Sequence, residues 1–216
     1  MIRIVIADDH TIVREGLKQI LSASPELVVA GEAQNGHEVI SRVRELEFDV
    51  LLLDMSMPGK SGIELIRQVR SEKPRVRILV LSMHEEEQYA VRAIKAGASG
   101  YLTKESASAQ LVSAIQKVAG GGAFISSAVA EQLALGAMPG AEGPPHSTLS
   151  DREFQVLKML VSGKTVSDIA ATLNLSVKTV STHKTRLMQK MNISSQADLI
   201  RYALTHRLLD DREPGV

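Results

Sequence analysis

Short apolar runs alternate with stretches of helical spacing through the first half of the chain. Ile2–Ala7 is a β-branched apolar run, and the apolar residues from Thr11 to Leu21 then recur at helical spacing. The same alternation repeats four times, with strands expected at 27–33, 50–53, 78–81 and 101–102, and helices at 39–46, 63–69, 89–96 and 111–118. The pattern predicts five strand-helix units in chain order.

The predicted strands of this half are almost continuously apolar, as in Val50–Leu53. Such runs are typical of a parallel sheet with helices on both faces, so we predict an open α/β sandwich. In these sheets the functional site lies at the carboxyl ends of the strands. The residues that directly follow the apolar runs are polar, namely Asp8, Asp9, Asp54, Ser82 and Lys104. We expect them to meet in one crevice.

The second half of the chain has only helical patterns. A short helix is expected at 127–135, and a stretch rich in Gly and Pro then runs from Gly136 to Pro145, as in a linker. Ser150 and Glu153 form a capping box at the start of the next helix. Further helices are expected at 165–173, from 177 to about 190, and from 195 onward. We therefore predict a first domain at 1–122, a linker with a short helix at 123–147, and an all-α four-helix domain at 148–210.

The charge is distributed unevenly between the two halves, although the 216-residue chain has no net charge. Residues 1–145 hold 15 Lys and Arg against 18 Asp and Glu, whereas 146–210 hold 9 against 5. A basic domain behind an acidic one suggests a polyanion partner for the C-terminal part.

Composition also restricts where the protein acts. No segment approaches the roughly 18 consecutive apolar residues that a membrane span needs. The first residues, MIRIVIADDH, reach acidic side chains before a signal-peptide core can form. The chain has no cysteine, which fits a reducing compartment. We expect a cytoplasmic protein with no membrane partner.

The polar residues at the strand ends favour phosphoryl chemistry. Asp8, Asp9 and Asp54 repel one another unless a hard divalent cation neutralises them, and oxygen ligands favour Mg²⁺. Asp54 follows the central strand, where its carboxylate can act as a nucleophile that accepts a phosphoryl group. The charge that develops on the transferred oxygens requires an ammonium and a hydroxyl opposite, and Lys104 and Ser82 supply these two groups.

Taken together, these residues resemble the receiver domain of two-component response regulators. The likeness rests on Asp8-Asp9, Asp54-Met55-Ser56-Met57-Pro58-Gly59, Leu81-Ser82 and Gly100-Tyr101-Leu102-Thr103-Lys104, and covers residues 1 to 122. It implies a flavodoxin-like five-stranded parallel sheet of order 2-1-3-4-5. Lys60 departs from the usual apolar residue of its loop.

The resemblance assigns roles to these residues. It implies that a sensor histidine kinase phosphorylates Asp54, that Ser82 and Tyr101 are the switch residues, and that Lys104 is the invariant lysine of the family. It also implies that Mg²⁺ is held by Asp9, Asp54 and the backbone carbonyl of Ser56, with Asp8 acting through water.

Residues 148–207 resemble the LuxR-type helix-turn-helix domain of the NarL/FixJ regulators. The matching stretches are Leu149–Glu153, Ile169–Leu173, Ser176–His183 and Lys190-Met191. The helix from Val177 to Lys190 has five basic or histidine side chains and no acidic one, as suits a helix that lies against phosphates. The candidate contacts to double-stranded DNA are Ser176, Lys178, Thr179, Ser181, Thr182, His183, Lys184, Thr185 and Arg186. Val166-Ser167 and Ser181 depart from the usual residues of the family, a difference that bears on the backbone affinity and on the operator sequence.

Two other functions fit part of the sequence. A Mg²⁺-dependent phosphatase with a transient aspartyl-phosphate explains the carboxylates but not the C-terminal helices, and the short loops leave little room to enclose a substrate. A LuxR-type sensor of an apolar ligand has no use for the carboxylates, and only 3% of the residues are aromatic. We therefore predict a regulator that is not an enzyme: phosphorylation of Asp54 switches DNA binding and favours a homodimer on two half-sites.

Overall fold

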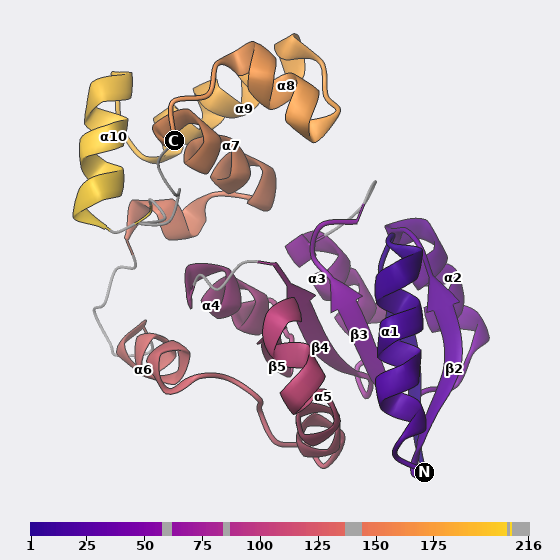
Figure 1. The fold of residues 1–216 in the computed structure, drawn as a ribbon. Coiled ribbons are helices and arrows are strands. Elements are labelled where there is room, and N and C mark those ends of the chain that lie inside the picture. The colour runs from indigo at the N-terminus through magenta and orange to yellow at the C-terminus, as the bar shows by residue number, and fades with distance from the viewer. Residues whose placement is uncertain (58–61, 84–86, 137–143, 207, 209–216) are drawn as a thin grey trace. The chain divides into compact units, whose positions relative to one another are not determined.

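The computed structural model describes residues 1–57, 62–83, 87–136, 144–206 and 208 of the chain. The chain divides into two compact units, Met1–Ala141 and Glu142–Val216 (Figure 1). Several positions used above lie outside the described residues. They are Pro58, Gly59 and Lys60 of the receiver motif, residues 137–143 of the predicted linker, and residues 207, 209 and 210 of the second predicted domain.

The first unit contains a five-stranded parallel sheet. Its strands lie in the order β2-β1-β3-β4-β5, as the resemblance implied. The bounds of the strands are β1 Ile2–Ala7, β2 Leu27–Ala33, β3 Val50–Asp54, β4 Arg77–Ser82 and β5 Gly100–Thr103. The predicted flavodoxin-like fold is therefore confirmed, and each predicted strand forms to within two residues of its expected ends.

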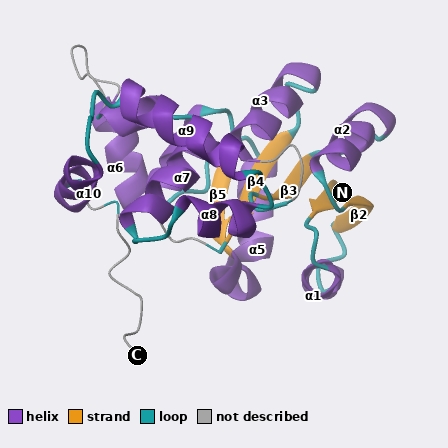
Figure 2. Ribbon diagram, turned by 90° about the horizontal axis from the view of Figure 1, so that it is seen from above, coloured by secondary structure: helices purple, strands orange, loops and turns teal. Residues whose placement is uncertain are grey.

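Helices cover both faces of this sheet (Figures 1 and 2). They are α1 Thr11–Ser22, α2 Gly36–Glu45, α3 Gly62–Glu72, α4 Glu87–Lys95 and α5 Lys104–Ala119. One apolar core packs α1 and α5 against one face, and a second core packs α2, α3 and α4 against the other. The central strand β3 is buried along its whole length because it contributes to both cores. This explains its continuous apolar sequence.

Helix α6, Ser127–Gly136, belongs to the first unit. It packs beside α4, and Val129 at its start is buried in the same core as α2, α3 and α4. The segment before it joins the sheet edge, since the backbone amide of Tyr101 donates to the carbonyl of Phe124 at 2.9 Å. The sequence placed this helix in the linker, whereas the structure docks it on the sheet-containing unit.

The second unit is entirely helical. A 3₁₀ turn, Pro145–Thr148, precedes α7 Asp151–Val161, α8 Val166–Leu173, α9 Val177–Lys190 and α10 Gln196–Thr205. Both arms of the predicted capping box of Ser150 and Glu153 are present, at 3.4 and 2.7 Å. Phe154, Leu157, Val180, Leu187 and Leu199 are fully buried between these helices. The four predicted helices form, and the 3₁₀ turn had not been predicted.

Within the part of the chain that the structure describes, no helix combines the length and the apolar character that a membrane crossing requires.

Candidate functional site

Two buried carboxylates lie side by side at the carboxyl ends of β1 and β3. The pairing of these strands places Ala7 opposite Leu53, so the next residues, Asp8 and Asp54, are neighbours. Both side chains are fully buried, whereas Asp9 is partly exposed at the edge of the site. The topology of the parallel sheet thus brings together the three acidic residues that the sequence singled out.

Lys104 contacts both buried carboxylates from the first turn of α5. Its Nζ atom lies 2.7 Å from Oδ2 of Asp8 and 3.1 Å from Oδ2 of Asp54. The side chain of Lys104 is only 12% exposed. The single ammonium group therefore balances part of the negative charge of a pair that has little contact with water.

Burial and charge have opposite effects on the pKa values of Asp54 and Lys104. Burial raises the pKa of Asp54, although the charge of Lys104 and the backbone amide of Ser56 partly lower it. Burial by itself lowers the pKa of Lys104, but the two carboxylates outweigh burial, and its pKa is raised. Lys104 therefore keeps its proton and its charge beside Asp54.

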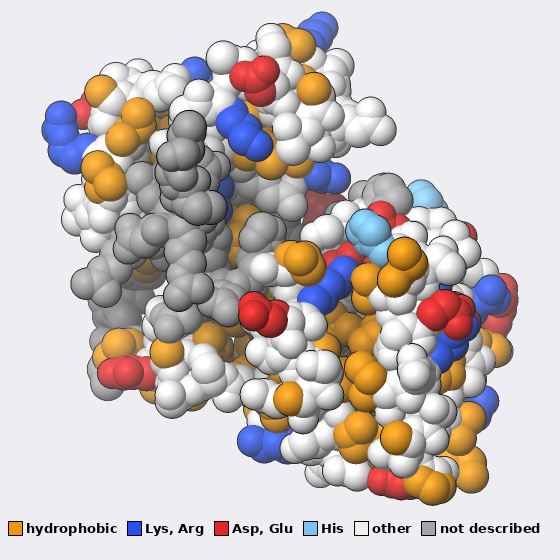
Figure 3. Space-filling model, viewed as in Figure 1, with side chains coloured by type: hydrophobic (Ala, Val, Ile, Leu, Met, Phe, Trp, Pro, Cys, Tyr) orange, Lys and Arg blue, Asp and Glu red, His pale blue; other side chains and the backbone are white. Residues whose placement is uncertain are grey.

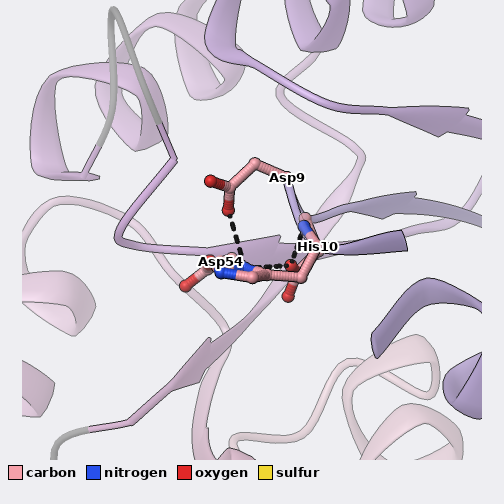
Figure 4. Close-up of side chains that lie close together, drawn as sticks. Asp9, His10 and Asp54 are labelled. Atoms are coloured by element: carbon pink, nitrogen blue, oxygen red, sulfur yellow. Dashed lines mark hydrogen bonds and ion pairs between the residues drawn. The ribbon is translucent and has the colours of Figure 1, made fainter. Parts of the chain in front are cut away.

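His10 contacts two carboxylates of the site, those of Asp8 and Asp9. Its Nδ1 atom lies 3.0 Å from Oδ1 of Asp9 and 3.2 Å from Oδ1 of Asp8, and its side chain is 64% exposed. Figure 4 shows its ring against the carboxylate of Asp9 with Asp54 beside it. The sequence prediction did not include His10, although a histidine directly after two aspartates is a recognisable signal for a further polar ligand.

The arrangement of oxygen atoms suits a divalent cation. One ligand atom from each of Asp8, Asp9, His10 and Asp54 lies within 4.8 Å of the others. Oδ2 of Asp8, Oδ1 of Asp9 and Oδ2 of Asp54 are buried and lack a hydrogen bond of good geometry. Lysine and histidine nitrogen atoms approach these oxygens closely, but such contacts leave lone pairs free. Carboxylate oxygens with free lone pairs are the ligands that Mg²⁺ prefers.

Ser56 lies in the exposed turn after β3. Its backbone amide donates to Oδ1 of Asp54 at 3.1 Å, which fixes the orientation of that carboxylate and leaves Oδ2 toward Lys104.

Ser82 and Tyr101 lie on the next two strands, β4 and β5. Ser82 is the last residue of β4, beside Leu81, which pairs with Asp54 across the sheet. Burial raises the pKa of Tyr101 to about 12, and a side-chain hydrogen bond with Ser82 acts in the opposite direction. The hydroxyl groups of Ser82 and Tyr101 are therefore in direct contact.

The ring of Tyr101 also borders the segment that leads into α6. A cavity of about 250 Å³ is lined by Tyr101, Thr103, Ser106, Phe124 and Val129, among others. The side chain of Tyr101 and Val129 in the first turn of α6 therefore border the same cavity.

Figure 3 shows acidic, basic and histidine side chains gathered on the first unit near the carboxyl ends of the strands.

A second residue that the sequence prediction missed is Arg14 of α1, which is 4% exposed. It lies on the buried stripe of its helix, at helical spacing from Leu17 and Leu21. An arginine on an apolar stripe is the signal that could have identified it.

In the second unit, α9 presents most of the residues predicted to contact DNA. Ser176 caps this helix by accepting a hydrogen bond from the amide of Thr179 at 3.0 Å. Exposed positions follow along the helix, namely Lys178, Ser181, Thr182, Thr185 and Arg186. Val180 and Leu187 are fully buried on the opposite side, as their spacing predicted.

The side chains on this face are ordered to different degrees. The hydroxyl groups of Thr182 and Thr185 donate to the carbonyls of Lys178 and Ser181, at 3.0 and 3.1 Å. Lys184 is half-buried and donates to Oε1 of Gln196 at 3.3 Å. The exposed Arg186 has greater freedom to meet a phosphate.

His183 lies on the inner side of the exposed face. It is half-buried, and its Nδ1 atom is buried without a hydrogen-bond partner. Burial lowers its pKa, although the charge of Glu153 acts in the opposite direction. Glu153 is itself buried and accepts a hydrogen bond from Lys190 at 2.7 Å. The position of His183 therefore favours a role in packing between helices more strongly than the sequence suggested.

Two family models match the chain. Residues 4–116 match the response regulator receiver domain, and residues 147–203 match the luxR family of bacterial regulatory proteins.

Related proteins share this arrangement along almost their whole length. The chain is 38% identical over 211 residues to the response regulator GacA of Pseudomonas viridiflava, covering 97% of this chain and 99% of that protein. It is 38% identical over 209 residues to the response regulator UvrY of Escherichia coli strain K12, covering 96% of each chain.

Solved structures resemble this chain as well. RcsB from Salmonella enterica serovar Typhimurium, bound to the promoter rprA in the presence of the phosphomimetic BeF3-, is 28% identical with a TM-score of 0.62. The match covers 95% of this chain and 100% of that one. A LuxR-family two-component response regulator from Aurantimonas sp. SI85-9A1 is 38% identical with a TM-score of 0.58, covering 62% of this chain and 96% of that one.

Proposed function

The chain belongs to the response regulators that join a receiver domain to a LuxR-type DNA-binding domain, and we propose that phosphorylation of Asp54 controls its binding to DNA. It is a phosphorylation-dependent transcription regulator of a two-component system. The residues that perform each step, the metal and the assembly on DNA are our proposals.

The position of Lys104 between Asp54 and Asp8 is the observation that carries the proposal. One carboxylate oxygen of Asp54 attacks the phosphorus atom of a phosphohistidine on a sensor kinase. The O–P bond forms as the N–P bond breaks, and the histidine nitrogen leaves with the electron pair. The charged ammonium of Lys104 stabilises the negative charge on the phosphoryl oxygens.

We propose that Mg²⁺ occupies the acidic site, held by Asp9, Asp54 and the carbonyl of Ser56, with Asp8 acting through water. The buried carboxylate oxygens without good hydrogen bonds support this choice of ligands. A bound Mg²⁺ neutralises charge on the carboxylates and on the transferred oxygens. Because burial raises the pKa of Asp54, a nearby cation also favours its ionised and nucleophilic form.

Ser82 and Tyr101 are the proposed switch residues. Their mutual hydrogen bond and the cavity between Tyr101 and Val129 support a route from the phosphorylated site to α6. Phosphorylation of Asp54 places new oxygen acceptors near Ser82, which shifts the equilibrium between two positions of the Tyr101 ring. The chain continues from α6 toward the DNA-binding unit.

The proposed DNA contacts are on α9 and at its start. The phosphate contacts are assigned to Ser176, Thr179, Lys184 and Arg186, and the groove contacts to Lys178, Ser181, Thr182 and Thr185. His183 remains a candidate from the sequence, and its partial burial favours a supporting role. Solved structures of RcsB include its complex with DNA and two RcsB dimers bound to two parallel DNAs. We expect this chain to bind double-stranded DNA as a homodimer when phosphorylated.

We further propose that the protein acts in the cytoplasm, receives its phosphoryl group from a sensor histidine kinase, and has no enzymatic turnover of its own on phosphate esters. The functional divisions would be a receiver domain at 1–122, a linker at 123–147 and a DNA-binding domain at 148–210.

The test uses the full chain with acetyl phosphate and Mg²⁺. Intact-mass measurement should find one phosphoryl group on the wild type and none on Asp54→Ala. Asp49→Asn is the matched control. Asp49 directly precedes the first residue of β3, at the end of the strand away from Asp54, and accepts a hydrogen bond from the amide of Arg3. Labelled protein should bind promoter DNA more tightly than unlabelled protein. Equal labelling of Asp54→Ala and the wild type contradicts the assignment, and steady release of phosphate from an ester contradicts the non-enzymatic function.

A further inference from the structure

The side chain of Arg14 joins three parts of the first unit behind the acidic site. Its Nε donates to Oε2 of Glu32 on β2 at 2.9 Å, and one terminal nitrogen donates to the backbone carbonyl of Asp8 at 2.8 Å. The other terminal nitrogen approaches the hydroxyl of Thr11 at 3.3 Å. A guanidinium group that is buried in this way is unfavourable unless every partner is present, so the geometry around it is closely defined.

The contact with the carbonyl of Asp8 bears directly on the acidic residues. This carbonyl belongs to the peptide that links Asp8 to Asp9, and its oxygen atom marks the orientation of that peptide plane. The backbone amide of Asp8 is held separately, by the carbonyl of Ala33 at 3.1 Å. Because both the amide and the carbonyl of Asp8 are hydrogen-bonded, the orientation of the peptide after Asp8 is restrained, and the carboxylate of Asp9 stays near Asp54.

We propose that Arg14 is a positioning residue for the divalent cation, because it fixes the peptide from which the carboxylate of Asp9 projects. The inference rests on the proposed metal site. Arg14 itself does not touch the cation: it acts through the backbone of Asp8. Partners behind metal ligands commonly change metal affinity by about 10- to 100-fold when they are removed, because the ligands then lose their orientation.

Lys18 provides a matched control one turn further along α1. Its Nζ atom donates to Oε1 of Glu32 at 2.9 Å, so it shares the carboxylate that orients Arg14. It has no contact with Asp8 among the interactions that the structure describes, and its side chain is 32% exposed. Replacing Lys18 therefore removes a cation from Glu32 without releasing the Asp8–Asp9 peptide.

The experiment measures direct binding of Mn²⁺ to the full chain by electron paramagnetic resonance. Mn²⁺ serves as the probe because it accepts the oxygen ligands that suit Mg²⁺. We expect Arg14→Met, which keeps an unbranched stem but has no donors, to weaken binding by about 10- to 100-fold. Arg14→Lys should also weaken it, since one ammonium cannot reproduce the fork that reaches Glu32 and Asp8. Lys18→Met should bind Mn²⁺ as the wild type does.

The outcomes distinguish this inference from the metal site on which it rests. Wild-type protein that binds no Mn²⁺, or Asp9→Asn protein that binds it unchanged, shows that the proposed metal site is wrong. Normal binding by folded Arg14→Met, with a normal wild type, overturns the positioning role alone. If Arg14→Met does not fold, Arg14→Lys decides: unchanged affinity overturns the role, and weakened affinity beside a normal Lys18→Met supports it. Equal weakening in Arg14→Met and Lys18→Met points to the charge around Glu32 and overturns it.

Discussion

The Nζ atom of Lys104 lies 3.1 Å from Oδ2 of Asp54, in a site where both side chains are shielded from water. The contact joins the first residue of α5 to the last residue of the central strand. Lys104 is held there by a second carboxylate, Asp8, at 2.7 Å. The ammonium is therefore already fixed at the site of the proposed phosphoryl transfer, and a preorganised charge of this kind favours electrostatic stabilisation of developing negative charge.

Removal of the Lys104 ammonium should leave phosphorylation of Asp54 possible but abolish the gain in DNA affinity that follows it. Lys104→Ala should keep its fold in the presence of Mg²⁺, because a divalent cation can replace the missing positive charge between Asp8 and Asp54. Without Mg²⁺ its melting temperature should fall further below that of the wild type, since breaking a buried ion pair costs about 3–5 kcal/mol. Thermal unfolding with and without a chelator measures this difference. Labelled Lys104→Ala that still gains DNA affinity like the wild type contradicts the role of Lys104 in the switch.

Arg186 should contribute to DNA binding without regard to sequence. It is exposed on α9 and carries a full charge, so Arg186→Ala should weaken binding to matched and scrambled sites alike. The slope of log affinity against log salt should decrease by about one if it neutralises one phosphate. Arg201→Ala, which removes the same charge from α10, is the control. Titration at several salt concentrations checks the prediction, and an unchanged slope in Arg186→Ala contradicts it.

Thr182 should affect which sequence is bound. Its hydroxyl donates to the carbonyl of Lys178, which leaves the oxygen lone pairs and the methyl group available to base edges. Thr182→Ala should therefore change the preference between matched and altered sites by about 1–3 kcal/mol, with little change in the salt dependence. Thr172→Ala is the control, because Thr172 makes the same bond to a backbone carbonyl on α8. Affinities that fall equally on all sites would place Thr182 against the backbone.

Protonation of His183 should destabilise the second unit at acidic pH. Burial lowers the pKa of His183 below its ordinary value of 6.5, so the folded unit disfavours the charged ring. Its contribution to the free energy of unfolding is then fully present above pH 6.5 and is lost as the pH falls through the lowered pKa. His183→Gln should flatten this dependence, whereas His37→Gln on the first unit should not.

Hydrogen exchange of α7 and α9, measured by mass spectrometry between neutral and mildly acidic pH, follows this effect locally. A second loss of stability is expected at lower pH, where Glu153 becomes protonated. Burial alone would raise the pKa of Glu153, but hydrogen bonds from Lys190 and Ser150 outweigh burial and lower the pKa. Its stabilising effect is therefore present above its ordinary pKa of 4.5 and is lost as the pH falls below that value. Protection factors of α7 and α9 that fall with acid in His183→Gln as they do in the wild type would refute the assignment to His183.

The sequence alone determined the order and kind of the elements and the residue types that gather in the acidic site. Apolar period and caps are local properties, so β3, α9 and the capping box of Ser150 could be predicted from neighbouring residues. The carboxyl ends of parallel strands must meet at one edge, which is why Asp8, Asp54 and Lys104 could be grouped before their distances were known.

Only the tertiary structure decided what depends on contacts between segments distant in sequence. The apolar stripe of α1 indicates that Arg14 is buried, but its partner Glu32 on β2 follows only from the packing of the unit. The docking of α6 on α4 depends on a core shared across the unit, and its sequence resembled that of an ordinary linker helix. His183 is a residue type that can contact DNA, but it is half-buried and interacts electrostatically with Glu153 of α7. Burial and charge pairing arise when elements pack, and local sequence limits them without fixing them.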